Sequence, residues 1–215
     1  MTARRDYILD LAYRECENNE LVGARAAKIS SLIRRNIPML PGCVVPVSAF
    51  YDFLHKHTIV AEFTRLLEQT DLRDPQKLRK VSATIKKKIL SSKIPEEISK
   101  AILAEYKTRS GLIHQPTLIL TASYVHPISI ASYPFSYSTI KQGETNLLIA
   151  VREIFASLFS EEQIRFRMEK KLGQFDIGVA ILIQKMIDVD RSGIVFSTSP
   201  RNKKSIIIET VYGFH

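Results

Sequence analysis

The sequence has no tryptophan, only two cysteines and no long apolar run. Cys16 and Cys43 are too few for a disulfide framework and do not form a metal-ligand cluster, so we expect free thiols in a reducing compartment. No window approaches the run of about eighteen apolar residues that a membrane-spanning helix needs. The charged N-terminal residues are not followed by the apolar stretch of a secretory signal. These absences predict a cytoplasmic protein without a membrane segment.

The sequence has the composition of an ordinary globular protein, with 45% hydrophobic and 25% charged residues over 215 positions. Much of its net charge of +9 lies in the run 77–90. Such a run indicates either a nucleic-acid-binding patch or the solvated face of an amphipathic helix. Leu78, Val81, Ile85 and Ile89 recur at helical spacing and no aromatic residues interleave the lysines, which favours the amphipathic helix. A basic nucleic-acid-binding protein remains an alternative.

Helical periodicity dominates the first two thirds of the chain. The predicted helices are 3–17, 24–35, 49–56, 59–69, a basic helix that begins at Asp74-Pro75, 95–107 and a pair within 143–171. Ser48, Thr58 and Ser160 are expected to cap three of them, because a hydroxyl oxygen accepts hydrogen bonds from the unpaired N–H groups of a first turn. Ser160 and Gln163 have the spacing of a capping box.

Strand-like segments appear mainly in the second half. Residues 117–125 are predicted to form a strand, whereas 126–140, rich in serine, tyrosine and proline, are predicted to be a loop or an irregular β segment. The apolar runs 175–186, 192–200 and 206–213 alternate with short polar turns and predict a three-stranded meander. The fold class is therefore α+β.

Three places in the sequence have residues that could bind a ligand. Gly23 and Arg25 lie where a helix begins, and small residues with a cation at a helix start can hold phosphate. Gln184 and Met186 end an apolar strand, where backbone groups and an amide can bind adenine. Glu209 follows three isoleucines, and a carboxylate ending a buried strand needs a partner. Each place also has a structural alternative. Gly23 and Arg25 can simply mark an ordinary helix start, Gln184 and Met186 a polar strand end, and Glu209 the point where a strand emerges into solvent.

No histidine, cysteine or carboxylate arrangement in the sequence predicts a metal site or a catalytic triad. His55 and His57 do not share a helix face, and His114 and His126 have no ligand cluster around them. The three places above are therefore the remaining candidates for ligand binding.

Taken in order, these segments resemble the N-terminal nucleotide-binding domain of the phosphoenolpyruvate synthase and pyruvate phosphate dikinase family. That family opens with Gly-Gly-Lys-Gly-Ala and then Gly-Ile-Pro-Val-Pro-x-Gly-Phe-Val-Val. The matching segments here are Leu21-Val-Gly-Ala-Arg-Ala-Ala, Asn36-Ile-Pro-Met-Leu-Pro-Gly-Cys-Val-Val, Ile154-Phe-Ala-Ser-Leu-Phe, Ile183-Gln-Lys-Met-Ile, Ser192-Gly-Ile-Val-Phe-Ser-Thr-Ser-Pro and Ile208-Glu-Thr-Val-Tyr-Gly-Phe. Their order and spacing carry the resemblance over nearly the whole chain.

The resemblance implies a single ATP-grasp-like domain over 1–215, with a Lys-rich helical insert at 48–110 and an incomplete C-terminal end. The family passes phosphate from ATP to a carrier histidine and then to pyruvate. By this resemblance Arg25 would neutralise the ATP phosphates, and Gln184 with the backbone near Met186 would hold adenine. Glu209 would support the ribose or phosphate side.

Other parts of the family's machinery are expected to lie beyond the last residue. They are the segment with the magnesium ligands, the phosphohistidine domain and the pyruvate-binding domain, so a longer chain or a partner chain would have to supply them. Magnesium is expected in an intact site, and no residue here is assigned to it.

Two departures from the family's motifs bear on activity. Arg25 stands where the glycine-rich segment has lysine, and Ala24 and Ala26 replace glycines, which restricts close backbone approach to phosphate. The family's Val-Arg-Ser-Ser-Ala strand reads Leu120-Thr-Ala-Ser-Tyr, so Thr121 replaces an arginine and a charge-assisted phosphate contact is lost. A degenerate, non-catalytic relative that binds nucleotide weakly or serves as a scaffold is therefore the main alternative.

Overall fold

The computed structural model describes residues 6–109, 115–126, 133–199 and 204–213. The chain forms two compact units, residues 1–185 and 186–215. Helices and antiparallel sheets occur together, which confirms the α+β class. None of the helices in the described ranges is long and apolar enough to cross a membrane.

The first unit is built on a five-stranded sheet with the order β1-β2-β5-β3-β4. The strands are β1 (Leu9–Asp10), β2 (Gly42–Val45), β3 (Thr117–Val125), β4 (Ser138–Gln142) and β5 (Gly178–Lys185). All neighbouring strands are antiparallel. The central strand β5 is buried over its first six residues, as its continuous apolar run predicts for a strand covered on both faces.

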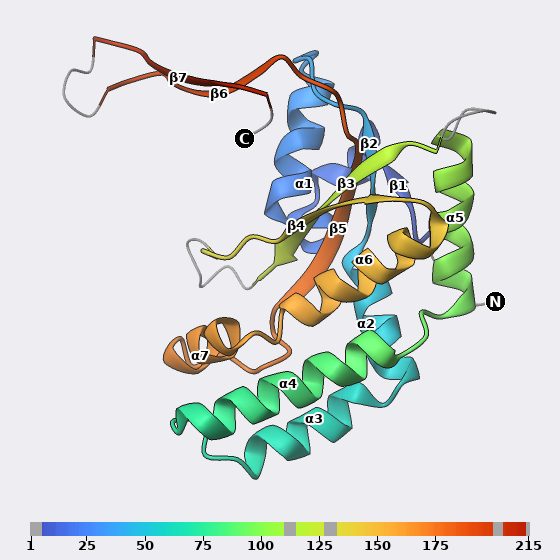
Figure 1. Ribbon diagram of the computed structural model, residues 1–215, viewed down its shortest axis with the longest axis vertical. Helices are drawn as coiled ribbons and strands as arrows, with labels where there is room; N and C mark the ends of the chain where they lie inside the picture. Colours follow the sequence, from blue (N-terminus) through green and yellow to red (C-terminus); the bar gives the residue numbers. More distant parts are fainter. Residues whose placement is uncertain (1–5, 110–114, 127–132, 200–203, 214–215) are drawn as a thin grey trace. The chain divides into compact units, whose positions relative to one another are not determined.

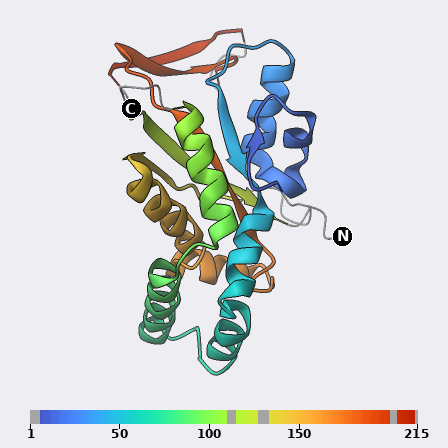
Figure 2. The same cartoon turned by 90° about the vertical axis from the view of Figure 1, so that its right-hand side faces the viewer.

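Helices cover both faces of this sheet (Figures 1 and 2). They are α1 (Asn19–Arg34), α2 (Val47–Lys56), α3 (Ile59–Glu68), α4 (Pro75–Ser91), α5 (Glu96–Arg109), α6 (Glu144–Ser157) and α7 (Glu161–Glu169). Helix α1 packs on one face against β3 and β5, whereas α2 and α6 pack on the other. The sheet thus separates a large helical layer from a single helix.

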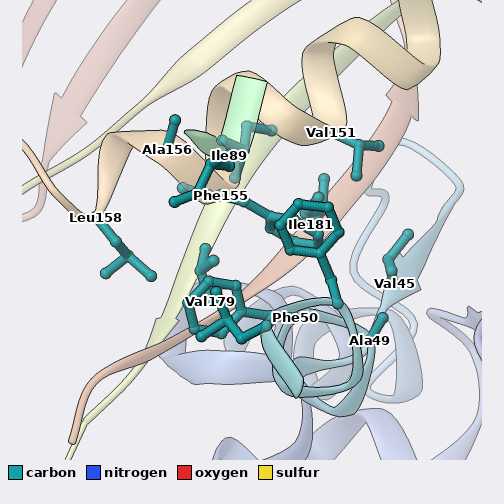
Figure 3. Close-up of a cluster of buried hydrophobic side chains, with 14 of the residues drawn as sticks. Val45, Ala49, Phe50, Ile89, Val151, Phe155, Ala156, Leu158, Val179 and Ile181 are labelled. Carbon is teal, nitrogen blue, oxygen red and sulfur yellow. The ribbon is translucent and has the colours of Figure 1, made fainter. Parts of the chain in front are cut away.

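The two faces have separate cores because strand side chains alternate. On the side of α2 and α6, the rings of Phe50 and Phe155 meet edge to face at 5.3 Å over Val179 and Ile181 (Figure 3). On the side of α1, a smaller cluster is formed by Leu11, Cys16, Val22, Ala26, Ala27, Val44, Ala180 and Leu182. Small residues in this second core let α1 approach the sheet closely.

The basic run forms the amphipathic helix that its spacing predicts. Leu78, Val81, Ile85 and Ile89 of α4 are all buried, at no more than 4% exposure. The lysines lie mostly on the outer side, and Lys88 forms an ion pair with Glu62 of α3. Packing therefore accounts for the periodicity of the run without a nucleic acid.

The predicted caps are confirmed at one of three positions. The Ser160 hydroxyl accepts the N–H of Gln163 and caps α7. Ser48 lies inside α2, which begins after Pro46. Thr58 precedes α3 but adopts φ 53° and makes no side-chain cap. Gln163 does not complete the capping box, because its amide bonds the hydroxyls of two tyrosines, Tyr124 and Tyr133.

One element prediction in the first unit is wrong. The expected helix 3–17 is replaced, in its described part, by β1 and a short 3-10 helix, Arg14–Glu17, because Leu9 and Asp10 pair with β2. The segment 126–140, expected to be a loop or an irregular β segment, contains in its described part the start of β4, which pairs with β3. Residues 127–132 of that prediction lie outside the described residues.

The second unit contains a hairpin of β6 (Arg191–Phe196) and β7 (Ile207–Tyr212), which form a sheet of their own. The predicted meander of three strands is wrong, since its first run became β5 and pairs with β2 and β3. The last run is not a buried strand either: every residue of β7 after Ile207 is exposed. Local periodicity located these strands but could not identify their partners.

Candidate functional site

Gly23 forms a sharp turn inside α1. Its φ of 76° and ψ of 162° interrupt the helix, so regular helix resumes at Ala24. A Cβ at Gly23 would lie 2.5 Å from the carbonyl oxygen of Ser123 in β3 and 2.6 Å from its Oγ. Only glycine combines this backbone conformation with such a close approach. Regular helix thus begins at 24 as predicted, but the preceding residues 19–22 are helical as well and not the expected extended segment.

Ser123 caps the resumed helix from another part of the chain. Its Oγ accepts the N–H of Ala26 at 3.0 Å, across 97 residues of sequence. A residue at the start of a helix usually provides this acceptor from its own side chain, but glycine has none. Ser123 is completely buried. Sequence reasoning missed this residue, because no local pattern links a serine in a strand to a distant helix.

Arg25 and Lys28 extend from the first turn of the resumed helix into solvent. Within the described part of the chain, neither side chain forms a hydrogen bond or an ion pair with another residue. The partial positive charge of a helix start adds to that of the two side chains. This end of α1 can therefore attract an anion.

Thr121 lies two residues from Ser123 in β3 and on the same face of the sheet, about 7 Å along the strand. It is 6% exposed, and its hydroxyl accepts a hydrogen bond from Ser138 in β4 at 3.0 Å. A short, uncharged pair of hydroxyl groups thus occupies this part of the α1 side of the sheet.

The Gln184 side chain lies on the same face of the sheet as that of Thr121. Thr121 pairs with Leu182 of β5, and Gln184, two residues further along β5, pairs with Ile119. Its Nε2 donates to the carbonyl oxygen of Leu40 at 2.8 Å, which ties the segment before β2 to the sheet. This bond fixes the orientation of the amide. The structure therefore brings Gln184, Gly23 and Arg25 to the α1 side of one sheet.

The other two predicted site residues belong to the second unit. Met186 is its first residue. Glu209 lies within β7 opposite Ile194 and is exposed, so no desolvation forces it to find a partner. Their roles stay predictions. In the described ranges, no group of three or more histidine, cysteine, aspartate or glutamate side chains is placed to hold a metal ion.

Residues 19–215 match the family model described as pyruvate phosphate dikinase, AMP/ATP-binding domain. The chain belongs to this family. A probable phosphoenolpyruvate synthase of Methanothermobacter thermautotrophicus is 28% identical over 200 residues, covering 90% of this chain and 29% of the relative. One from Archaeoglobus fulgidus is 29% identical over 222 residues, covering 96% and 28%. The phosphoenolpyruvate synthase of Escherichia coli is 25% identical over 201 residues, covering 88% and 25%.

These matches confirm the family suggested by the sequence motifs. The chain spans less than a third of the length of the relatives it matches. Within this dikinase-family domain, the chain forms a sharp turn at Gly23, which is followed two residues later by the exposed Arg25. The uncharged Thr121–Ser138 pair lies on the neighbouring strands β3 and β4. The α1 side of the sheet therefore combines a glycine turn and an exposed cation with a neutral pair of hydroxyl groups.

Proposed function

We propose that the chain is the nucleotide-binding part of a phosphoenolpyruvate synthase-like phosphotransferase and that it binds ATP on the α1 side of its five-stranded sheet. The observation that carries this proposal is the turn at Gly23, which packs against Ser123 and starts a helix bearing exposed Arg25. Backbone N–H groups and a cation at a helix start suit phosphate. Membership of the AMP/ATP-binding domain family supports ATP as the ligand.

The roles proposed for the site residues are those that the family resemblance implies. Arg25 neutralises the phosphates, Gln184 and the backbone near Met186 hold adenine, and Glu209 supports the ribose or phosphate side. Gln184 lies near the end of β5, which closes the first unit at Lys185, and Met186 begins the second unit.

The complete phosphate transfer needs more than this chain. We propose that the whole protein transfers phosphate from ATP through a carrier histidine to pyruvate, with the magnesium ligands, the phosphohistidine and the pyruvate site on other segments or on a partner chain. The relatives with phosphoenolpyruvate synthase names are more than three times as long as the aligned part. The chain by itself is expected to bind nucleotide without turnover.

Calorimetric titration of the purified chain with ATP, with and without magnesium and with GTP as control, tests this function. Saturable binding that prefers ATP to GTP supports the proposal. Absence of ATP binding under both conditions contradicts it and favours the scaffold alternative, in which the fold persists without its ligand.

Replacing Gln184 with alanine is expected to weaken ATP binding roughly three- to tenfold, because one hydrogen bond to the base is lost and the Leu40 segment is released. Calorimetry measures the change. Gln142→Ala is the matched control, since the Gln142 amide also donates to a backbone carbonyl, that of Gln115, at 2.8 Å. Equal ATP affinity in Gln184→Ala and the unmodified chain would remove Gln184 from the site.

A further inference from the structure

We propose that Ser123 is a positioning residue for nucleotide binding, which holds the Gly23 turn against β3 and thereby fixes where Arg25 projects. This inference rests on the proposed function. Ser123 is completely buried, so it cannot contact a ligand in this arrangement. Its effect on binding would pass through the turn.

Ser123 contacts the turn at two points. Its backbone carbonyl and its Oγ face the Cα of Gly23 so closely that a Cβ there would lie 2.5 and 2.6 Å away. Its Oγ also accepts the N–H of Ala26 in a buried hydrogen bond. Removing the hydroxyl would leave that N–H buried without a partner, and an unpaired buried donor is costly. The turn would then shift to satisfy it.

Arg25 lies between the two residues that Ser123 contacts, Gly23 and Ala26. Its side chain is exposed and makes no hydrogen bond or ion pair within the described residues. The backbone on either side is thus the only element that the structure shows orienting it. A relaxed turn would let the Arg25 side chain sample more directions. The entropic cost of ordering that side chain on a phosphate would then be larger.

The strand β3 connects the contact between Ser123 and the Gly23 turn to the rest of the proposed site. Ser123 and Thr121 share one face of β3. By the family resemblance, Thr121 stands where an arginine would contact phosphate. Because β3 is an interior strand that pairs with both β4 and β5, it is a rigid support. Ser123 therefore transmits the position of a fixed strand to a helix start that is 97 residues away in sequence.

The test is a double-mutant cycle with Ser123→Ala and Arg25→Ala, measured by ATP titration of the full chain. We expect Ser123→Ala to weaken ATP binding roughly tenfold in the unmodified background and to have little further effect when Arg25 is already alanine. Amide hydrogen exchange should increase at Ala26 and its neighbours in Ser123→Ala. Additive effects of the two substitutions would overturn the positioning role.

Ser30→Ala is the matched control. Ser30 lies in the same helix, is also completely buried, and its hydroxyl donates to the carbonyl of Tyr13. Its replacement should lower the free energy of unfolding and leave ATP affinity unchanged. An equal loss of affinity in both serine variants, or unchanged affinity in Ser123→Ala, would overturn the inference alone. Absence of ATP binding in the unmodified chain would overturn the proposed function, and this inference with it.

Discussion

Replacing Gly23 with alanine is expected to lower the free energy of unfolding by about 3 kcal/mol and to abolish measurable ATP binding, because the turn would have to move. The φ of 76° and ψ of 162° lie in a region that is essentially restricted to glycine. The added Cβ would also overlap the backbone carbonyl of Ser123 at 2.5 Å, and a central strand cannot yield as a flexible side chain would. Urea unfolding measures the first effect and calorimetry the second.

Gly143→Ala is the control that separates the effect of backbone strain on stability from an effect on ATP binding. Gly143 has a similar backbone conformation, φ 89° and ψ 150°, and also precedes a helix, α6. Among the described residues, a Cβ there meets only the end of the Gln115 side chain, at 3.3 Å. This substitution should cost about 1–3 kcal/mol of stability through backbone strain and leave ATP binding intact. If Gly23→Ala binds ATP as tightly as Gly143→Ala does, the turn is not part of the site.

The glycine turn and α4 could be predicted because their signals are local. The helical spacing of Leu78, Val81 and Ile85 marks a buried stripe whatever lies against it. Gly23 stands before a run of helix-forming residues, which indicates a helix start. In both places, local preference and tertiary packing agree.

The remaining features depend on contacts between distant segments. The pairing of Leu9 with Val44 overrides the helical periodicity of residues 3–17. The pairing of β5 with β2 and β3 means that β5 is not part of the expected meander. The Ser123 cap has no local pattern either, since any strand serine looks the same in sequence. The exposure of Glu209 depends on how β7 is packed, which three preceding isoleucines do not determine.

Thr121→Arg is expected to raise ATP affinity roughly tenfold or more, because it places a guanidinium on the α1 face beside the glycine turn. A hydrogen bond to a charged group contributes about 1.5–3 kcal/mol. The neighbouring Ser138 is exposed, so a longer side chain at position 121 has a path out of the sheet to the phosphates. The increase should appear for ATP and be absent for adenosine, which has no phosphate.

Thr139→Arg is the control for added charge. Thr139 pairs with Leu120, so its side chain lies on the opposite face of the sheet from Thr121. Because both variants add one positive charge, a general electrostatic effect would raise ATP affinity equally in the two, which would contradict a specific site on the α1 face. A gain confined to Thr121→Arg would mean that the fold retains a phosphate position that its own sequence leaves without an arginine.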